Sequence, residues 1–225
     1  MVLVVRDYPS SSYPHGSAFS LVLEQDRILE LSHREVYTRR RGVELKIISG
    51  GQTGVDRGGL DAALEAGIDH GGFCPLGRRA EDGLIPARYA LTEASTDAYP
   101  ARTAMNVRQG HGTLLLVHGT AGLSHSVGTK LTLKMCRQQK KPWYAADPRR
   151  HDHVPRVVSW IDELRRDVEV PQGWLVGLER EEVLIINIAG PRESKVPGIH
   201  DETVVFLRMV LDELREVWPH SQLSK

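Results

Sequence analysis

The sequence predicts a three-layer α/β fold, in which helices cover both faces of a mostly parallel sheet, preceded by an N-terminal extension. Two observations predict this class. From Leu45 onward, short apolar segments alternate with segments whose apolar residues recur at helical spacing. Glycine-rich turns join several of the apolar segments to the helical ones. The chain has 225 residues, which is long enough to bury one such core.

The predicted strands are short and apolar, and we expect them at residues 45–48, 71–74, 113–117, 143–145 and 183–188. The first predicted helix carries Leu60, Ala63 and Leu64 and ends at Gly67, a residue type typical of helix C-termini. The remaining helices are predicted at residues 99–109, 128–140, 154–166 and 201–217. Residues 75–89, between the second strand and the second helix, are predicted to form a charged loop.

The closing helix shows the clearest pattern, because its apolar residues follow the helical period along one stripe. These residues are Val204, Leu207, Val210, Leu211 and Leu214. The first 44 residues do not fit the alternation. Residues 19–36 are compatible with a helix or with a hairpin, and periodicity does not decide between them. We therefore divide the chain into an extension at 1–44, a domain at 45–217 and a tail at 218–225.

Charge and cysteine content restrict the partners of the chain. Lysine and arginine total 29, as do aspartate and glutamate, so the molecule as a whole has no basic field that would attract nucleic acid or a membrane. No segment approaches the roughly 20 apolar residues that span a bilayer, and no secretory leader is visible, so we expect a cytoplasmic protein.

Cys74 and Cys136 stand apart and suit a reduced compartment. We expect no metal site, and homo-oligomerisation stays open.

The most informative segment is the glycine-rich turn between the first strand and its helix. Its residues are Gly50, Gly51, Gln52, Thr53 and Gly54. Glycines let an anion approach the main chain closely, and the N-terminus of the following helix offers unpaired N–H donors. The turn lacks the lysine of a Walker A loop and the spacing of a dinucleotide fingerprint. We therefore expect a phosphate or another oxyanion here, unless the glycines only permit a tight turn and close packing.

Two charged residues at the start of this helix have alternative roles. Asp56 contacts a ligand or only caps the helix. Arg57 pairs with a ligand phosphate or with a neighbouring carboxylate. The charged loop at residues 77–83 contributes Arg78, Glu81 and Asp82, and one arginine with one carboxylate would serve a substrate. The alternative is that these are ordinary exposed loop charges.

Two further loops are expected beside the first, because ligands of doubly wound sheets bind beyond the carboxyl ends of the strands. Residues 119–129 offer hydroxyls and glycine near a helix start, and residues 187–195 offer an amide and a guanidinium. The candidate ligand residues in them are Ser126, Gly128, Thr129, Asn187, Gly190 and Arg192. Helix capping by Ser126 and Thr129, and a weak surface pair between Arg192 and Glu193, are the alternatives.

Five sequence blocks together resemble one family. They are SGGQTGVDRGGLDAA, FCPLGRRAEDGLIPARYALTE, RTAMNVRQG, VGTKLTL and NIAGPRESKVPGI. In this order they resemble the circularly permuted YpsA-like branch of the SLOG superfamily, also labelled molybdenum carrier proteins. The resemblance runs from about Leu45 to Val217. It implies a Rossmann-like fold with a nucleotide-type ligand site at Gly50, Gly51, Thr53, Gly54, Asp56, Arg57, Gly128 and Thr129.

The resemblance also implies two functions that the residues distinguish in part. A carrier or sensor would bind a small phosphate-bearing ligand such as molybdenum cofactor or a nucleotide. A relative of the LOG-type phosphoribohydrolases would cleave a nucleotide with a glutamate, and Thr132 stands where that glutamate would be. Cleavage would then need Asp56, Glu81 or Asp82 as the carboxylate. We therefore expect binding, with nucleotide hydrolysis as the alternative.

Overall fold

The computed structural model describes residues 43–119, 126–168 and 183–218, together with the backbone of three short strands nearer the N-terminus. Contacts divide the chain into two units, one at residues 1–42 and 170–181 and the other at 43–169 and 182–225. The first unit holds an antiparallel sheet in the order β1-β2-β3. Its strands are β1 (Val4–Val5), β2 (Phe19–Leu23) and β3 (Arg27–Leu31). Of the two alternatives for residues 19–36, antiparallel strands are therefore observed.

The second unit is built on a five-stranded parallel sheet in the order β11-β10-β12-β4-β5. The strands are β4 (Glu44–Ile48), β5 (Asp69–Gly71), β10 (Gly112–Leu116), β11 (Trp143–Ala146) and β12 (Val183–Ala189). All five residues of β10 are buried, as expected for an inner strand covered on both faces. The sheet confirms the predicted α/β class.

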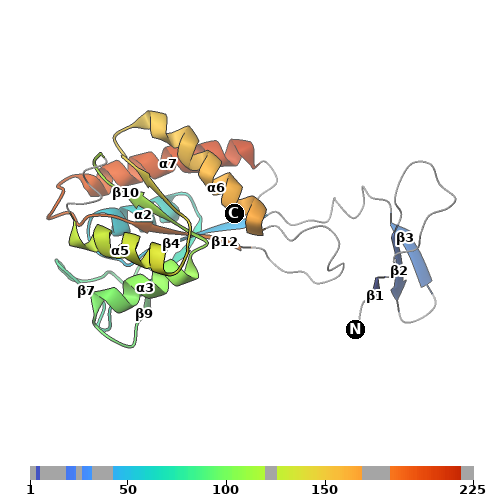
Figure 1. Cartoon of the computed structure of the whole chain (residues 1–225), viewed down its shortest axis with the longest axis horizontal. Coiled ribbons are helices and arrows are strands. Elements are labelled where there is room, and N and C mark those ends of the chain that lie inside the picture. The colour runs from blue at the N-terminus through green and yellow to red at the C-terminus, as the bar shows by residue number, and fades with distance from the viewer. Residues whose placement is uncertain are drawn as a thin grey trace. The chain divides into compact units, whose positions relative to one another are not determined.

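Helices form a layer on each face of this sheet (Figure 1). They are α2 (Val55–Glu65), α3 (Tyr99–Gln109), α5 (Val127–Gln138), α6 (Val154–Val168) and α7 (Ile199–Val217). Helices α2 and α6 both pack against α7 on one face, whereas α3 and α5 pack together on the other. The three-layer sandwich is thus confirmed, and a short 3-10 turn, η1 (His151–His153), leads into α6.

The strand order reveals a rearranged chain path. If β12 is counted first, followed by β4, β5, β10 and β11, the spatial order β5-β4-β12-β10-β11 reads 3-2-1-4-5, which is the Rossmann order. Here the strand that comes first in that scheme lies last in the sequence. The connections leave β12 and β10 toward opposite faces, since α7 follows β12 and α5 follows β10. Folds of this kind bind ligands where the connections diverge, which here is the carboxyl edge between these two strands.

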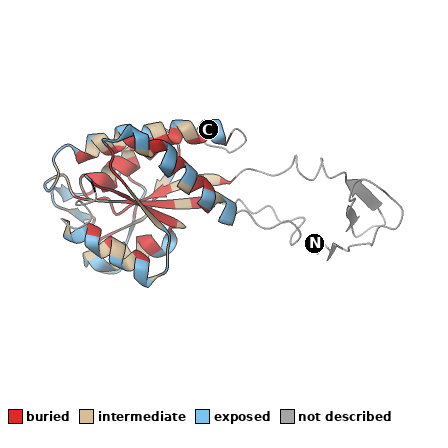
Figure 2. Cartoon of the chain, turned by 45° about the horizontal axis from the view of Figure 1, so that its top comes forward, coloured by how far each residue is buried: buried red, intermediate tan, exposed pale blue. Residues whose placement is uncertain are grey.

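The core lies between the sheet and its two helical layers (Figure 2). On α7, four members of the predicted apolar stripe, Leu207, Val210, Leu211 and Leu214, are buried, while Val204 is half-buried. Phe206 adds a fully buried ring to the same face. Burial of this stripe against α2 and the sheet stabilises the layer by about 25 cal/mol per Å² of apolar surface removed from water.

The structure differs from the predicted elements at two places. The predicted strand at residues 71–74 is divided at Gly72, whose φ is 114°, into β5 and a separate strand β6 (Phe73–Cys74), which pairs with β9 (Thr92–Glu93). A β-carbon at Gly72 would lie 2.3 Å from the Ser49 carbonyl oxygen, so only glycine fits where the chain passes the end of β4. The predicted loop at 75–89 contains a small hairpin of β7 (Arg79–Ala80) and β8 (Gly83–Leu84).

The described helices carry charges along their lengths, and none of them is both long and apolar enough to cross a bilayer. Among the described residues, no three side chains of the His, Cys, Asp and Glu types converge in a way that would hold a metal ion. Both cysteines are buried free thiols.

Candidate functional site

The three predicted ligand loops follow β10, β12 and β4, which are neighbours in the sheet, so the loops emerge side by side at its carboxyl edge. The first and third loops touch directly. Val55 N–H donates to the Pro191 carbonyl at 3.3 Å, and Glu193 N–H donates to Thr53 Oγ1 at 3.4 Å. Of the second loop, residues 120–125 lie outside the described residues.

The glycines of the first loop are surrounded by other parts of the chain. A β-carbon at Gly50 would lie 1.2 Å from Nη1 of Arg102, and one at Gly51 would lie 2.5 Å from Leu91 Cδ1. At Gly54, a β-carbon would lie 2.6 Å from the Pro191 carbonyl oxygen, and φ is +76°. Close packing against protein atoms therefore accounts for glycine at all three positions, as the packing alternative expected.

Asp56 forms a buried ion pair under this loop. Arg102 Nη1 donates to its Oδ2 at 3.0 Å, and Gln52 N–H donates to the same oxygen at 3.3 Å. Burial raises the pKa of the Asp56 carboxyl above its ordinary value, although the charges of Arg102 and Arg192 oppose the rise. Gly54 precedes α2 as its N-cap residue and no side chain caps the helix, so Asp56 holds the preceding loop instead of capping its own helix.

The guanidinium of Arg57 is held by the chain itself. Its Nε donates to the Gly51 carbonyl at 3.1 Å, and its two terminal nitrogens donate to the Asp82 carboxylate at 2.5 and 2.8 Å. These hydrogen bonds lower the pKa of Asp82. Of the two alternatives for Arg57, the structure places it on a neighbouring carboxylate.

Glu81 joins the hairpin to both neighbouring loops. Its carboxylate accepts hydrogen bonds from Thr53 Oγ1, from Ser194 Oγ at 2.5 Å and from Ser194 N–H at 3.2 Å. Its own N–H donates to Gln52 Oε1 at 2.9 Å. Burial opposes ionisation, but the hydrogen bonds from Ser194 and Thr53 outweigh it and lower the pKa of Glu81. Glu81 is therefore an ionised clamp between the loops.

The two remaining candidate arginines, Arg78 and Arg192, differ in the number of hydrogen bonds that their guanidinium groups make within the protein. Arg78 donates four hydrogen bonds, all to backbone carbonyls between residues 85 and 91. The side chain of Arg192 is 42% exposed, and its guanidinium lies 5.2 Å from the ring centre of Tyr99 and 3.9 Å from Glu81. Among the described residues it donates no hydrogen bond, so Arg192 is the better placed of the two for an external anion.

The start of α5 presents the second loop's candidates. Ser126 Oγ caps the helix by accepting from Thr129 N–H at 3.4 Å, and Gly128 is exposed. The Thr129 hydroxyl is buried and has no hydrogen-bond partner in the described part of the chain. Thr132 Oγ1 donates to the Gly128 carbonyl at 3.0 Å. Capping therefore accounts for Ser126, while the Thr129 hydroxyl has an unused hydrogen-bonding capacity.

The candidates on β12 and just beyond it lie within the fold. Asn187 is buried, and its Nδ2 donates to Thr113 Oγ1 at 3.2 Å across to β10. At Gly190, a β-carbon would lie 2.4 Å from the Leu116 carbonyl oxygen. Asn187 thus joins β12 to β10 within the sheet, and Gly190 lets the chain pass close to the end of β10.

Two polar residues that are not among the predicted ligand residues also lie at this edge. His118 follows β10 and makes a 2.5 Å contact with Glu202 at the start of α7. Asp147 follows β11 and accepts from Gly119 N–H at 2.8 Å. Hydrogen bonds from Arg149 hold the pKa of Asp147 well below its usual range. Both residues follow the end of a strand within two positions, and this is the sequence signal that could identify them.

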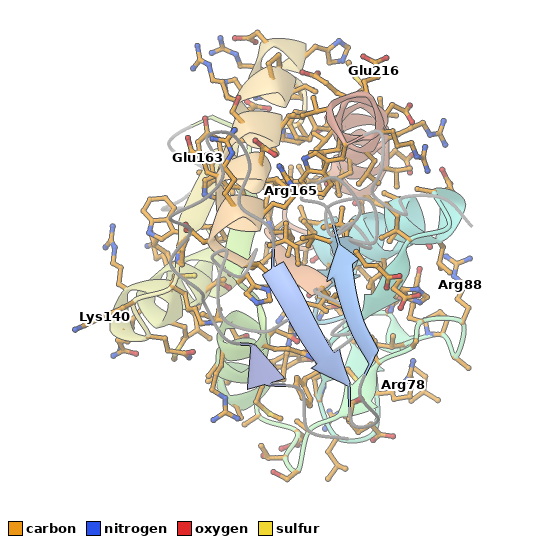
Figure 3. The ribbon with its side chains drawn as sticks, turned by 90° about the vertical axis from the view of Figure 1, so that its right-hand side faces the viewer. Arg78, Arg88, Lys140, Glu163, Arg165 and Glu216 are labelled. Carbon is orange, nitrogen blue, oxygen red and sulfur yellow. The ribbon has the colours of Figure 1, made fainter. Side chains whose placement is uncertain are left out.

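A separate groove of about 460 Å³ lies between α2 and α7, away from the three loops. It is lined by Asp61, Leu64, Glu65, Arg88, His200, Asp201, Val204 and Val205. His200 bridges two carboxylates there, with Nδ1 2.8 Å from Asp201 and Nε2 2.9 Å from Asp61. Figure 3 shows Arg88 at the outer side of this region.

Comparison with known proteins adds two findings. Residues 47–211 match the sequence profile described as "Circularly permutated YpsA SLOG family". The chain is also similar to the 1.45 Å crystal structure of a "Putative molybdenum carrier protein" from Syntrophus aciditrophicus SB. The two sequences are 34% identical, the match covers 77% of this chain and 99% of that one, and the TM-score is 0.60. No protein among the curated ones matches the chain significantly.

Proposed function

The chain belongs to the circularly permuted YpsA family of the SLOG superfamily, and from this premise we propose that it binds a phosphate-bearing, nucleotide-derived ligand. The proposed site is the crevice at the carboxyl edge of the sheet, beside the loops that follow β4, β10 and β12. The solved relative is named a molybdenum carrier, and we extend the proposal to a carrier of molybdenum cofactor, with a nucleotide sensor as a related role.

The observation that carries the proposal is that the guanidinium of Arg192 is exposed and donates no hydrogen bond within the described residues. Its side chain is 42% exposed in the loop after β12, and its guanidinium lies beside the Tyr99 ring and the Glu81 carboxylate. The guanidinium has five N–H donors in a planar fork that fits a phosphate. None of them donates a hydrogen bond within the described residues, so the group is ready to bind an anion.

Buried polar atoms next to the crevice support the same conclusion. Ser49 Oγ, Gln52 Nε2 and Thr129 Oγ1 are buried and lack hydrogen-bond partners in the part of the chain that the structure describes. A buried polar atom without a partner costs about 1–3 kcal/mol. A ligand or water that hydrogen-bonds to these atoms would recover that cost, and all three atoms belong to loops at this edge or to the helix that follows one.

Molybdenum cofactor suits the site through its phosphate and its pterin ring. The phosphate would bind Arg192 and the start of α5, where Ser126 and Thr129 lie. Among the described residues, no group of three His, Cys, Asp or Glu side chains is suited to metal binding. The molybdenum of such a ligand would therefore have to be coordinated by the cofactor itself. The protein would therefore hold this cargo by its organic part.

Binding is favoured over hydrolysis because the candidate carboxylates are already engaged. Asp56 pairs with Arg102 in a buried site, Asp82 pairs with Arg57, and Glu81 clamps Thr53 to Ser194. A general acid or base must reach the substrate within hydrogen-bond distance. These three side chains would have to leave their present partners before they could serve cleavage.

The test is a thermal-shift screen of the full chain with molybdenum cofactor, adenine nucleotides, ADP-ribose and cytokinin-type ribotides, with chromatography of each mixture. A ligand at 100 times its dissociation constant should raise the melting temperature by roughly 5–10 °C at this size. Arg192→Ala should weaken binding at least about tenfold. Arg108→Ala is the matched control, because Arg108 is exposed at the far end of α3.

The outcomes separate the candidate functions. A shift with intact ligand, lost in Arg192→Ala and kept in Arg108→Ala, supports a carrier or sensor. Product in the mixture would make the protein a hydrolase. Equal affinity of the two variants would remove Arg192 from the site, and with it the main support for the proposal.

A further inference from the structure

Positive charge is concentrated in one stretch of this otherwise neutral chain. Residues 98–146 contain no aspartate and no glutamate. The lysines and arginines of this stretch are Arg102, Arg108, Lys130, Lys134, Arg137, Lys140 and Lys141. The stretch comprises α3, β10, α5 and β11, so it includes both described helices of the layer on one face of the sheet. The remaining residues of the chain are net acidic, because Lys and Arg balance Asp and Glu overall.

Five of these cations are exposed and have no side-chain partner within the described residues. They are Arg108, Lys130, Lys134, Arg137 and Lys140, which we call the basic face. Within the described residues, none of their side chains forms an ion pair or a hydrogen bond. The other two cations are engaged, since Arg102 pairs with Asp56 and Lys141 Nζ donates to the Gly110 carbonyl at 2.9 Å.

The members of the basic face share one surface. Lys130, Lys134 and Arg137 follow at spacings of four and three residues, so they lie on one side of α5 along about 10 Å of its axis. Lys140 continues beyond the helix end and points away from the sheet (Figure 3). The middle of α3 lies beside the end of α5, because Gln139 Nε2 donates to the Ala104 carbonyl at 3.1 Å, and Arg108 follows Ala104 one helical turn later.

Favourable helix-dipole interactions account for only part of this arrangement. Cations near a helix C-terminus are stabilised by the dipole, which accounts for Arg108, Arg137 and Lys140. Lys130 lies in the first turn of α5, where the dipole disfavours a cation, and that turn contains no acidic residue. In the opposite layer, by contrast, exposed charges pair with one another, as Arg208 does with Glu65 and Arg215 with Asp212.

We propose that the basic face binds the phosphate backbone of duplex DNA without sequence preference. A duplex carries one negative charge per about 1.7 Å of axis, and lysines and arginines in a row neutralise it with release of counterions. An acidic protein is a poorer match, since lysine is depleted in protein interfaces while aromatic residues are enriched. No aromatic residue in the described part of the chain is exposed, which also disfavours a single strand, because single strands stack on aromatic rings.

An anionic membrane is a poorer match as well. Surface-bound helices insert apolar side chains beside their cations. Val127 is the exposed large apolar residue of α5, and the others among the described residues belong to different elements. Among the described residues, the basic face therefore has one exposed valine beside its cations, which is too little apolar surface to anchor a helix in a membrane, and its charge fits a phosphate-backbone contact better.

The test is fluorescence anisotropy of the full chain with two labelled 20-base-pair duplexes of unrelated sequence, from 50 to 200 mM salt. Both duplexes should bind with equal affinity, and the logarithm of the affinity should fall linearly with the logarithm of the salt concentration. The variant Lys130→Glu/Lys134→Glu/Arg137→Glu should lose at least about tenfold in affinity, with a salt slope smaller by about two to three. Lys130→Arg/Lys134→Arg keeps the charge and should keep both the affinity and the salt slope. This variant shows whether substitution at these positions by itself disturbs binding.

A charge-matched control tests the location. Arg79→Glu/Arg156→Glu/Lys195→Glu changes the net charge equally at exposed positions outside the basic face and should leave binding nearly unchanged. The proposal is overturned if neither duplex binds, or if both triple variants lose affinity equally. Tighter binding of single strands, polyglutamate or phosphatidylserine vesicles than of duplex DNA would also overturn it.

Discussion

The guanidinium of Arg102 occupies the space in which a side chain on Gly50 would begin. A β-carbon at Gly50 would lie 1.2 Å from Arg102 Nη1, the atom that donates to buried Asp56 at 3.0 Å. The glycine of the first loop is therefore required by an ion pair beneath it, and the arginine that fills the space comes from the second α/β crossover. This contact ties α3 to the start of α2.

Gly50→Ala should destabilise the fold by about 3 kcal/mol. The added methyl group would force Arg102 away from Asp56, and a buried carboxylate that loses its partner costs about 3–5 kcal/mol. Urea unfolding followed by circular dichroism measures the difference. Gly128→Ala is the control, because a β-carbon there would meet nothing closer than Ser126 Oγ at 3.8 Å. An equal effect of the two substitutions would show that the Arg102 contact is not what requires glycine.

The stability of the α2–α7 contact should depend on pH through His200. Burial disfavours its charged form, but the hydrogen bonds with Asp201 and Asp61 outweigh burial and raise the pKa of His200. The folded state therefore holds the proton more tightly than the unfolded state. This stabilisation is complete below the unfolded pKa of about 6.5 and is lost as pH rises through the higher folded value.

The measurement is the free energy of unfolding between pH 5.5 and 8.5 for the wild type and for His200→Gln. The difference between the two should shrink as the pH rises, because glutamine does not titrate. His151→Gln serves as the control, since His151 is exposed on the 3-10 turn before α6. Parallel pH profiles for wild type and His200→Gln would contradict the assigned bonds.

Local signals in the sequence predicted most helices and strands of the sheet. They could not predict which side chains far apart in the sequence pair with one another. Helix α3 has the predicted bounds because Pro100 lies in its first turn and Gly110 ends it. The β7–β8 hairpin escaped prediction, since strands of two residues carry no period. The partner of Asp56 lies 46 residues away, so only the fold brings the pair together. The family and the three-layer fold were predicted and confirmed, whereas the ligand residues stay predictions.

Asp162 should be one of the larger polar contributors to stability. It accepts from Trp218 Nε1 at 2.8 Å and from Arg165 and Arg166, and so joins α6 to the end of α7. Asp162→Ala removes the acceptor of a buried indole N–H and should cost about 2 kcal/mol in chemical denaturation. Asp167→Ala, an exposed position on the same helix, should change stability by less than about 0.5 kcal/mol.

Glu81→Gln tests whether Glu81 serves to join the loops or acts as a catalytic carboxylate. The ionised carboxylate accepts from Thr53 and Ser194, and hydrogen bonds to a charged group contribute about 1.5–3 kcal/mol. Glutamine keeps one acceptor oxygen, so the loops after β4 and β12 should stay joined with a loss of about 1–2 kcal/mol.

Because the pKa of Glu81 is lowered, its contribution is present above the ordinary pKa of about 4.3 and lost as pH falls through the folded value. The stability difference between wild type and Glu81→Gln should therefore vanish in acid. Ligand binding at neutral pH should weaken only in proportion to the loosened loops, and Asp97→Asn, at an exposed carboxylate outside the clamp, should leave it unchanged. If wild type releases a product and Glu81→Gln binds normally but releases none, Glu81 is a catalytic group and the clamp is secondary.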